Sequence, residues 1–467
     1  MPTQKHTASQ FPLLLCAFGL PILYWIYLLY TAQTEIKWDS FDYEHLGQMI
    51  TLQGWAEFFK TGPNREPIYP LLISLCMRLA DGLHVPYLKV LAALQFALLF
   101  LTQLFSFKIL QKLNVKPAVS ALAVFYIGIS PALVNCALSL YSEILIIALI
   151  PAAILIFSKI FNSFSTYNLS RVIFAGIVIG LTLIALTFVK GIFEIAGPAI
   201  ILSSLLISKR IAKKPDAFKR YLIMILAGLF MFYAAIFAYK AANKHYNGNF
   251  TLTNRGAWAF YGFATRRVEP MPKERLMAGL AFIPGEGACK KFYSEEQCYF
   301  WSFYTSDNFS ITKLKELMAQ GYEGEALDKE LMRLSVAKIT SAPLQYTILT
   351  ALEGLKVIFW ETTKLGFVIY PGWLAALYDV EIFKNFLRMA WAVLSLVGSI
   401  YGVLLLLPRR KNKLDEKAFI TLFIVLSVAF FYTAVYSLFQ LGPRYSVPAG
   451  PIMICLTALF MQRFYKL

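Results

Sequence analysis

Long, uninterrupted runs of apolar residues dominate the chain. Ten of them approach or exceed the length needed to cross a membrane as a helix. They cover residues 11–31, 86–107, 117–135, 143–160, 171–189, 191–208, 221–240, 384–407, 418–438 and 446–462. This pattern predicts an all-α polytopic membrane protein with a bundle of about 10–12 transmembrane helices, counting one or two doubtful segments.

Composition supports the membrane interpretation. The 467 residues are 58% hydrophobic and only 15% charged, whereas soluble domains are about a quarter charged. The net charge of +17 does not indicate a nucleic-acid partner, because no basic module with interleaved aromatic residues is present. It fits basic cytoplasmic connections and contact with phosphate-bearing membrane lipids.

The connections between the runs differ sharply in charge. Residues 108–116, 208–220 and 408–417 are basic, and basic loops stay on the cytoplasmic side. Because successive spans cross the membrane in opposite directions, four other connections must then lie outside, together with the turn at Lys190. These connections are 32–85, 136–142, 241–383 and 439–445. This topology requires that residues 66–84 lie along the membrane face. If they crossed it, most later loops would be reversed.

These assignments divide the chain into three parts. Residues 1–240 form an N-terminal membrane module whose first external loop, 32–85, contains juxtamembrane helices. Residues 241–383 form an external region, and residues 384–467 form the C-terminal membrane helices. The segment 346–381 fits either a hairpin of short spans or an interfacial helix rich in Trp and Tyr.

Two of the six cysteines lie in the polar external region. Cys289 and Cys298 flank "KKFYSEEQ", with no His or further Cys nearby to complete a zinc site. We therefore expect a disulfide between them and an oxidising compartment around the external region.

Four polar clusters fall on the external side of this topology. The first contains Asp39, Asp42 and Glu66, the second Ser142 and Glu143, the third Lys190, and the fourth Arg444 and Tyr445. A carboxylate can accept a proton from an acceptor hydroxyl. Lys and Arg side chains can hold a phosphate leaving group. Individually, such residues are more often solvated surface, ion-pair partners or side chains that reach lipid headgroups.

The order of these motifs resembles GT-C class integral membrane glycosyltransferases. These include the protein O-mannosyltransferases and the bacterial aminoarabinose transferases. The resemblance covers most of residues 10–205 and 384–467. Its motifs are "DSFDYEHLG" (39–47), "REPIYPLL" (65–72), "SPALVNCALSLYSEIL" (130–145), "LTFVKGIFEIAGP" (186–198) and "GPRYSVPAGPIM" (442–453). Lys190 stands where this family more often has Arg, and residues 241–383 match nothing in it.

The resemblance implies an inverting glycosyltransferase in a bacterial inner membrane, with its site facing the periplasm. The sugar would move from a polyprenyl-phosphate donor, similar to undecaprenyl phosphate, to an envelope glycan such as lipopolysaccharide, a lipid or a protein. Asp39 would be the general base, with a pKa moved toward neutral by partial burial. Asp42 and Glu143 are the other candidate catalytic carboxylates. The donor phosphate would contact Arg65, Tyr69, Lys190, Arg444 and Tyr445.

Two questions stay open at the level of sequence. Some relatives use a divalent ion, and oxygen ligands for Mg²⁺ or Mn²⁺ are available from Asp39, Asp42, Glu66 and Glu143. The alternative function is a transporter or flippase for lipid-linked glycans. It is disfavoured because few ionisable residues lie deep in the spans and no repeated halves are visible.

Overall fold

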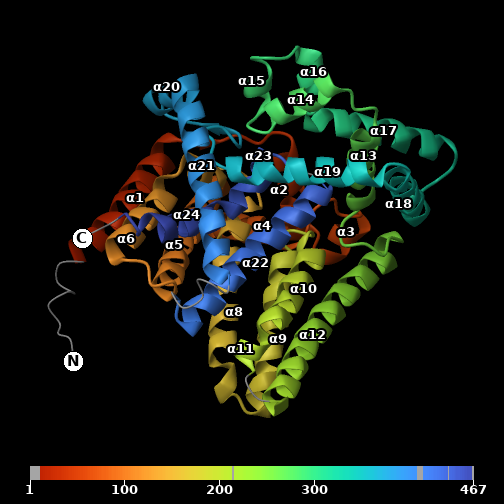
Figure 1. Cartoon of the computed structure of the whole chain (residues 1–467). Coiled ribbons are helices and arrows are strands. Elements are labelled where there is room, and N and C mark those ends of the chain that lie inside the picture. Colours follow the sequence, from red (N-terminus) through yellow and green to blue (C-terminus); the bar gives the residue numbers. More distant parts are fainter. Residues whose placement is uncertain (1–10, 213–214, 408–413, 440, 465–467) are drawn as a thin grey trace, which may run out of the picture.

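The computed structural model describes residues 11–212, 215–407, 414–439 and 441–464, and these are mostly helical. The two strands, β1 (Gln33–Thr34) and β2 (Val368–Ile369), are two residues each and pair antiparallel. An all-α polytopic architecture is therefore confirmed for the described residues (Figure 1).

Eight helical segments in the described ranges are long and apolar enough to cross a membrane, or up to nine if a bent pair counts as one span. The bent pair is α6 (Pro117–Ile129) and α7 (Pro131–Leu138), which meet at 44°. The helices of the other spans are α1 (Phe11–Thr31), α5 (Tyr87–Lys112), α8 (Glu143–Ser163), α9 (Leu169–Thr187), α12 (Pro215–Asn247), α21 (Glu381–Leu406), α22 (Glu416–Phe439) and α24 (Gly450–Met461). The last span also includes α23 (Pro443–Ser446) and η6 (Val447–Ala449).

By this criterion, two of the ten expected spans are not single helices. One is 117–135, which falls in the bent pair of α6 and α7. The other is the run 191–208. It forms three short segments beside α9 and α12: α10 (Phe193–Ser203), η3 (Ser204–Ile207) and α11 (Ser208–Ile211). The hydroxyls of Ser203 and Ser204 donate to the carbonyl oxygens of Ile200 and Ile201. Such side-chain bonds compete with the regular helix and favour a tighter turn.

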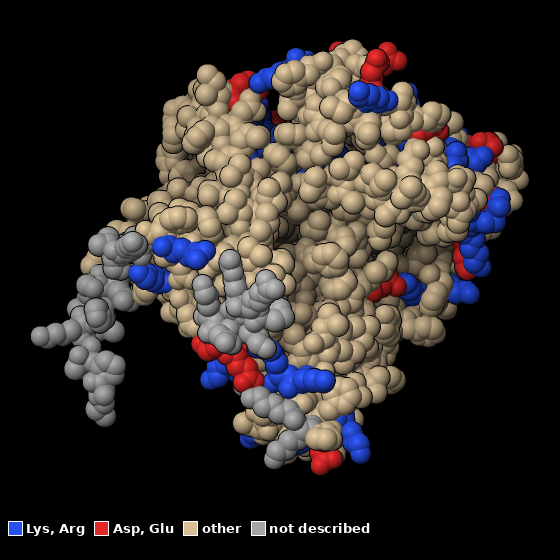
Figure 2. All heavy atoms as spheres, viewed as in Figure 1, with Lys and Arg blue, Asp and Glu red and all other residues tan. Residues whose placement is uncertain are grey.

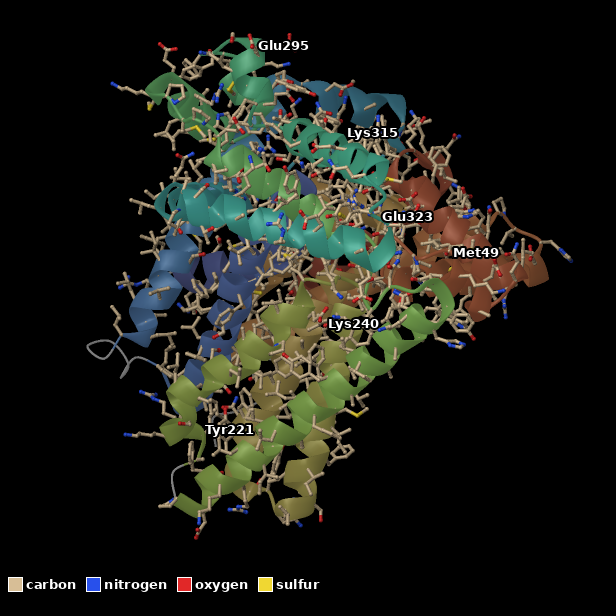
Figure 3. The ribbon with its side chains drawn as sticks, turned by 90° about the vertical axis from the view of Figure 1, so that its right-hand side faces the viewer. Met49, Tyr221, Lys240, Glu295, Lys315 and Glu323 are labelled. Carbon is tan, nitrogen blue, oxygen red and sulfur yellow. A yellow bond between two sulfur atoms is a disulfide. The ribbon has the colours of Figure 1, made fainter. Side chains whose placement is uncertain are left out.

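Small residues allow two membrane helices to pack closely. A Cβ added to Gly176 of α9 would lie 2.6 Å from the carbonyl oxygen of Met224 in α12, and one on Gly180 would lie 2.7 Å from that of Gly228. This small-xxx-small spacing permits close backbone contact between membrane helices. Figure 3 shows α12 running from Tyr221 at one end of the molecule to Lys240 below the helices that follow α12 in the chain.

The loop after α1, which the sequence predicts to be external, forms three short helices that are not candidate spans: α2 (Asp39–Leu52), α3 (Trp55–Lys60) and α4 (Ile68–Leu83). Tyr43, Leu46 and Ile50 share the buried side of α2, as the apolar pattern predicts. The segment 66–84 is therefore not a candidate span, as the predicted topology requires.

The region between α12 and α21 is a layer of helices at one end of the bundle (Figure 1). These are named the external helices, after the location that the sequence predicts for them. It contains α13 (Gly256–Val268), α14 (Lys273–Phe282), α15 (Glu286–Cys289), α16 (Glu295–Tyr299), α17 (Phe303–Ala319), α18 (Gly324–Ser341), α19 (Pro343–Gly354), η4 (Leu355–Phe359) and α20 (Gly372–Asp379). Cys289 and Cys298 are joined by a disulfide. Small apolar clusters around Trp301 and Tyr261 give this layer its own core.

The basic connections meet at the opposite end of the bundle. The Asn114 side chain donates to Asp415 at 2.8 Å, the Arg210 guanidinium lies over the ring of Phe419, and Arg220 donates to the carbonyl oxygen of Tyr167. Figure 2 shows charged side chains over the external helices and near the ends of the membrane helices, with a mostly uncharged band between them.

This arrangement predicts the result of thiol labelling. Lys329 and Lys209 are both exposed and lie at opposite ends of the bundle. We expect Lys329→Cys to react with a membrane-impermeant maleimide in intact cells and Lys209→Cys to react only after permeabilisation, because basic loops stay inside. The wild-type chain, with its exposed Cys16, sets the background. The reverse labelling pattern would contradict the orientation.

Candidate active site

Asp39 is placed by a sharp change of chain direction after the first membrane helix. Trp38 adopts a positive φ of 54°, which non-glycine residues rarely do, and Asp39 begins α2. One carboxylate oxygen of Asp39 lies 2.6 Å from Nη2 of Arg65, and the other lies 2.7 Å from Nη2 of Arg444. The structure thus joins the loop after α1 to the start of the last span.

Glu143 connects this pair to Lys190. It is fully buried at the start of α8, and its Oε1 accepts from Nζ of Lys190 at 2.9 Å and lies 3.0 Å from Nε of Arg444. Arg444 therefore bridges Asp39 and Glu143. Three cations and two buried or half-buried carboxylates, from four separate connections, form one ion-pair chain.

Asp39 does not have the neutral-shifted pKa expected from the sequence. Burial alone would raise its pKa, but the guanidinium groups of Arg444 and Arg65 outweigh burial and lower it. The expectation of a pKa near neutral is therefore wrong, because both carboxylate oxygens contact arginine. The carboxylate stays ionised at neutral pH.

The other sequence-predicted residues have clear but different positions. Asp42 contacts the same Arg65 at 2.9 Å and is about half exposed. Glu66 accepts the backbone N–H of Gly191 at 2.7 Å. Tyr69 is fully buried and donates to Gln95 at 2.8 Å, so it does not face the cavity described next and acts as a packing residue.

A cavity of about 570 Å³ adjoins the ion-pair chain. Four cations line one part of it: Arg65, Lys190, Arg255 and Arg444. Tyr445 also lines it, with its hydroxyl 3.1 Å from Arg444 and its ring beneath Lys190. Asp39 and Glu143 do not line the cavity. They contact cations that do line it: Arg65, Lys190 and Arg444. Lys240 and Lys329 also line the cavity, as do four carboxylates: Glu66, Glu194, Glu325 and Asp328. Cations therefore outnumber carboxylates in the lining.

Another part of the cavity wall is apolar. Ile195 of α10, Phe250 and Met332 of α18 lie there, and Ile195 and Met332 are substantially exposed. The combination of clustered cations and an apolar wall suits a ligand that has an anionic group and a hydrocarbon chain.

The four candidate metal ligands do not gather as a metal site. Among the described residues, no group of three or more His, Cys, Asp or Glu side chains is placed to hold a metal ion. Asp39, Asp42 and Glu143 contact cations instead, and Glu66 accepts a backbone N–H. This donor set does not fit a resident divalent ion.

Two residues near the site were not predicted from the sequence. Arg255 lies 3.9 Å from Asp39 and lines the cavity. Asp307 of α17 is partly buried, and burial together with the nearby charge of Asp39 raises its pKa to about 7. Both lie in the segment 241–383, where no motif marks them, so only the folded chain reveals them.

No protein-family model matches the chain, and no curated protein matches it. The helical fold and the apolar spans define an integral membrane protein. The resemblance to the GT-C class stays a prediction.

Proposed function

We propose that the protein is an inverting glycosyltransferase that uses a polyprenyl-phosphate sugar donor on the external face of the membrane. The observation that carries this proposal is the cavity itself, in which Lys190, Arg255 and Arg444 are next to an apolar wall. The cations would bind the phosphate and stabilise the negative charge that develops on it as the sugar departs. The apolar wall would receive the start of the polyprenyl chain.

Asp39 would accept the proton of the acceptor hydroxyl. Transition states of glycosyl transfer are oxocarbenium-like, so the acceptor oxygen becomes acidic as the new bond forms. A carboxylate of low pKa can therefore take the proton. Glu143 is fully buried between Lys190 and Arg444, so its role in this scheme is to position these two cations.

Asp307 is a second candidate for the proton acceptor. Its pKa of about 7 suits general base catalysis near neutral pH. The two carboxylates make different predictions for substitution, which are set out in the Discussion.

The proposal is tested by measuring donor binding to a variant of Arg255, a residue whose loss should leave folding intact. The Arg255 side chain is partly exposed and its ion pair is long, so we expect Arg255→Ala to fold normally. It should weaken binding of polyprenyl phosphate to the purified protein about tenfold, which corresponds to one lost charge-assisted hydrogen bond.

Lys60→Ala is the matched control. Lys60 is an exposed cation paired with Glu57 on α3 and does not line the cavity. Equal affinities of wild type, Arg255→Ala and Lys60→Ala for polyprenyl phosphate would contradict the proposed donor site.

A further inference from the structure

A second cavity, of about 220 Å³, lies between the external helices and the start of α21. Three cations line it: Arg266 of α13, Lys356 of η4 and Arg388 of α21. Gly442 also lines it, two residues before Arg444 of the candidate active site. The two cavities are therefore neighbours at the start of the last span.

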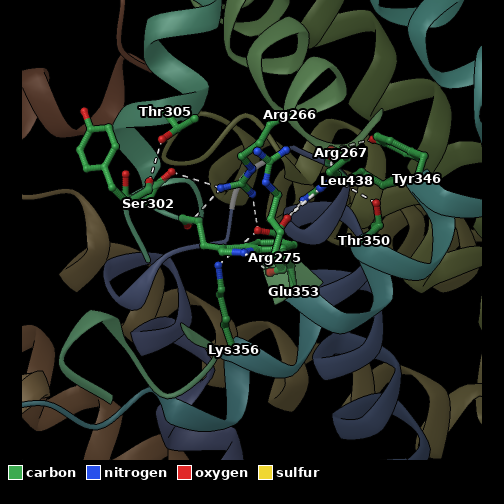
Figure 4. A network of polar contacts seen from close by, with 12 residues as sticks. Arg266, Arg267, Arg275, Ser302, Thr305, Tyr346, Thr350, Glu353, Lys356 and Leu438 are labelled. Carbon is green, nitrogen blue, oxygen red and sulfur yellow. Dashed lines mark hydrogen bonds and ion pairs between the residues drawn. The ribbon is translucent and has the colours of Figure 1, made fainter. Parts of the chain in front are cut away.

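A buried ion cluster forms the floor of this cavity (Figure 4). Arg266 and Arg267 both contact the carboxylate of Glu353, with Nε of Arg267 at 2.7 Å from Oε2. Nζ of Lys356 lies 3.2 Å from the other oxygen, Oε1. Both arginines are essentially inaccessible to solvent. The carboxylate of Glu353 is therefore the shared counter-ion of three cations.

Two buried donors in this cavity have no partner. Nε of Arg266 and Nε of Arg388 make no hydrogen bond with any residue that the structure describes. Within the part of the chain that the structure describes, no ion pair involves Arg388, and its guanidinium packs on Gly285. That glycine has a φ of +134°, and a side chain there would meet the Arg388 guanidinium.

The charges around this cavity do not balance. The cluster of Arg266, Arg267, Lys356 and Glu353 carries a net charge of about +2, and Arg388 adds one more. Glu353 does not line the cavity itself, and the acidic residue that does, Glu286, is about half exposed and pairs with Lys290. Burial lowers the pKa of Lys356, although the charge of Glu353 opposes this effect. Buried cations in excess of their counter-ions are costly unless an anion joins them.

We propose that this second cavity binds a phosphomonoester group through Arg388, Lys356 and Arg266. A phosphomonoester carries about −1.5 to −2 charges at pH 7. It therefore offsets the excess positive charge around the cavity better than a carboxylate, with its single charge, does. Arginine side chains bind its oxygens with paired hydrogen bonds. The group is carried by a lipid headgroup or by a soluble phosphate ester. The inference does not depend on sugar transfer, because it concerns a different cavity.

Binding of radiolabelled inorganic phosphate to the purified full chain tests this inference, at fixed ionic strength because salt screens charge. We expect saturable binding that Arg388→Gln weakens about tenfold or more, since a charge-assisted hydrogen bond is lost. Arg388→Lys keeps the charge and should lie between wild type and Arg388→Gln. Lys384→Gln is the matched control: it removes a cation one turn away on α21 that is paired with Glu381, and it should bind phosphate as wild type does.

Two lipid probes identify the source of the phosphate. Tighter binding of short-chain phosphatidic acid than of inorganic phosphate, with no binding of short-chain phosphatidylcholine, supports a lipid headgroup. Equal binding of phosphatidic acid and inorganic phosphate supports a soluble ester. The inference is overturned if wild type shows no saturable phosphate binding, or if Arg388→Gln binds as wild type while Lys190→Ala loses all binding. In the latter case phosphate occupies only the first cavity.

Discussion

Asp39→Asn should lower the rate of sugar transfer by about two orders of magnitude, the lower end of what general base catalysis contributes. The substitution keeps the size of the side chain and removes the proton acceptor. It also leaves Arg65 and Arg444 without the carboxylate that contacts both of them. Binding of the polyprenyl-phosphate donor should change much less, because the cavity is lined by the cations rather than by Asp39. The measurement is single-turnover transfer by the purified variant.

Asp42→Asn and Asp307→Asn separate the possible roles. Asp42 is half exposed and contacts only Arg65, so Asp42→Asn should have a smaller effect than Asp39→Asn. If Asp307→Asn abolishes transfer while Asp39→Asn retains it, the proton acceptor is Asp307 and Asp39 only positions the arginines. If all three variants retain near wild-type transfer, the cluster has no role in proton transfer.

Glu143→Gln should destabilise the folded protein by about 3–5 kcal/mol, the usual cost of removing one partner from a buried ion pair. Glu143 is fully buried and pairs with both Lys190 and Arg444. The amide has nearly the same size, so the loss comes from the missing charge: Lys190 loses its carboxylate partner, and Arg444 keeps only Asp39. Thermal unfolding of the purified protein in detergent measures the effect.

Glu194→Gln is the matched control for this stability prediction. Glu194 pairs with Lys240, and both side chains are partly exposed, so its loss should cost only about 0–1 kcal/mol. Equal unfolding midpoints for the two variants would show that the Glu143 cluster is solvated in the folded protein, contrary to the structure.

The sequence was sufficient to predict that the site residues share one end of the bundle. Charge asymmetry between loops placed Asp39, Glu143, Lys190 and Arg444 on the same side, and the structure brings them into contact. Their pairing could not be predicted, because Asp39 and Arg444 are 405 positions apart and no local pattern encodes such a contact. The lowered pKa of Asp39 follows from this pairing and was missed for the same reason.

The other differences between the predictions and the structure arise from local hydrogen bonds or from contacts between residues far apart in the chain. Hydropathy alone indicated one apolar span at 191–208, whereas the helix there is broken into α10, η3 and α11 at Ser203 and Ser204. The cluster of Arg266, Arg267 and Glu353 joins two helices of the external region across more than 80 residues. In the sequence these are ordinary charged residues of a polar segment. Tyr69 fits the motif of the GT-C class by position, but only the structure shows that its hydroxyl contacts Gln95.

Mass spectrometry of cell-envelope glycans tests the proposed transferase activity most directly. The comparison uses cells that carry the gene, cells that lack it, and deletion cells complemented with wild type or with Asp39→Asn. We expect one sugar to disappear from a single class of glycan, lipid or protein on deletion and to return with wild type but not with Asp39→Asn. Identical envelope glycans in all four strains, with the protein present in the membrane, would contradict the proposed function.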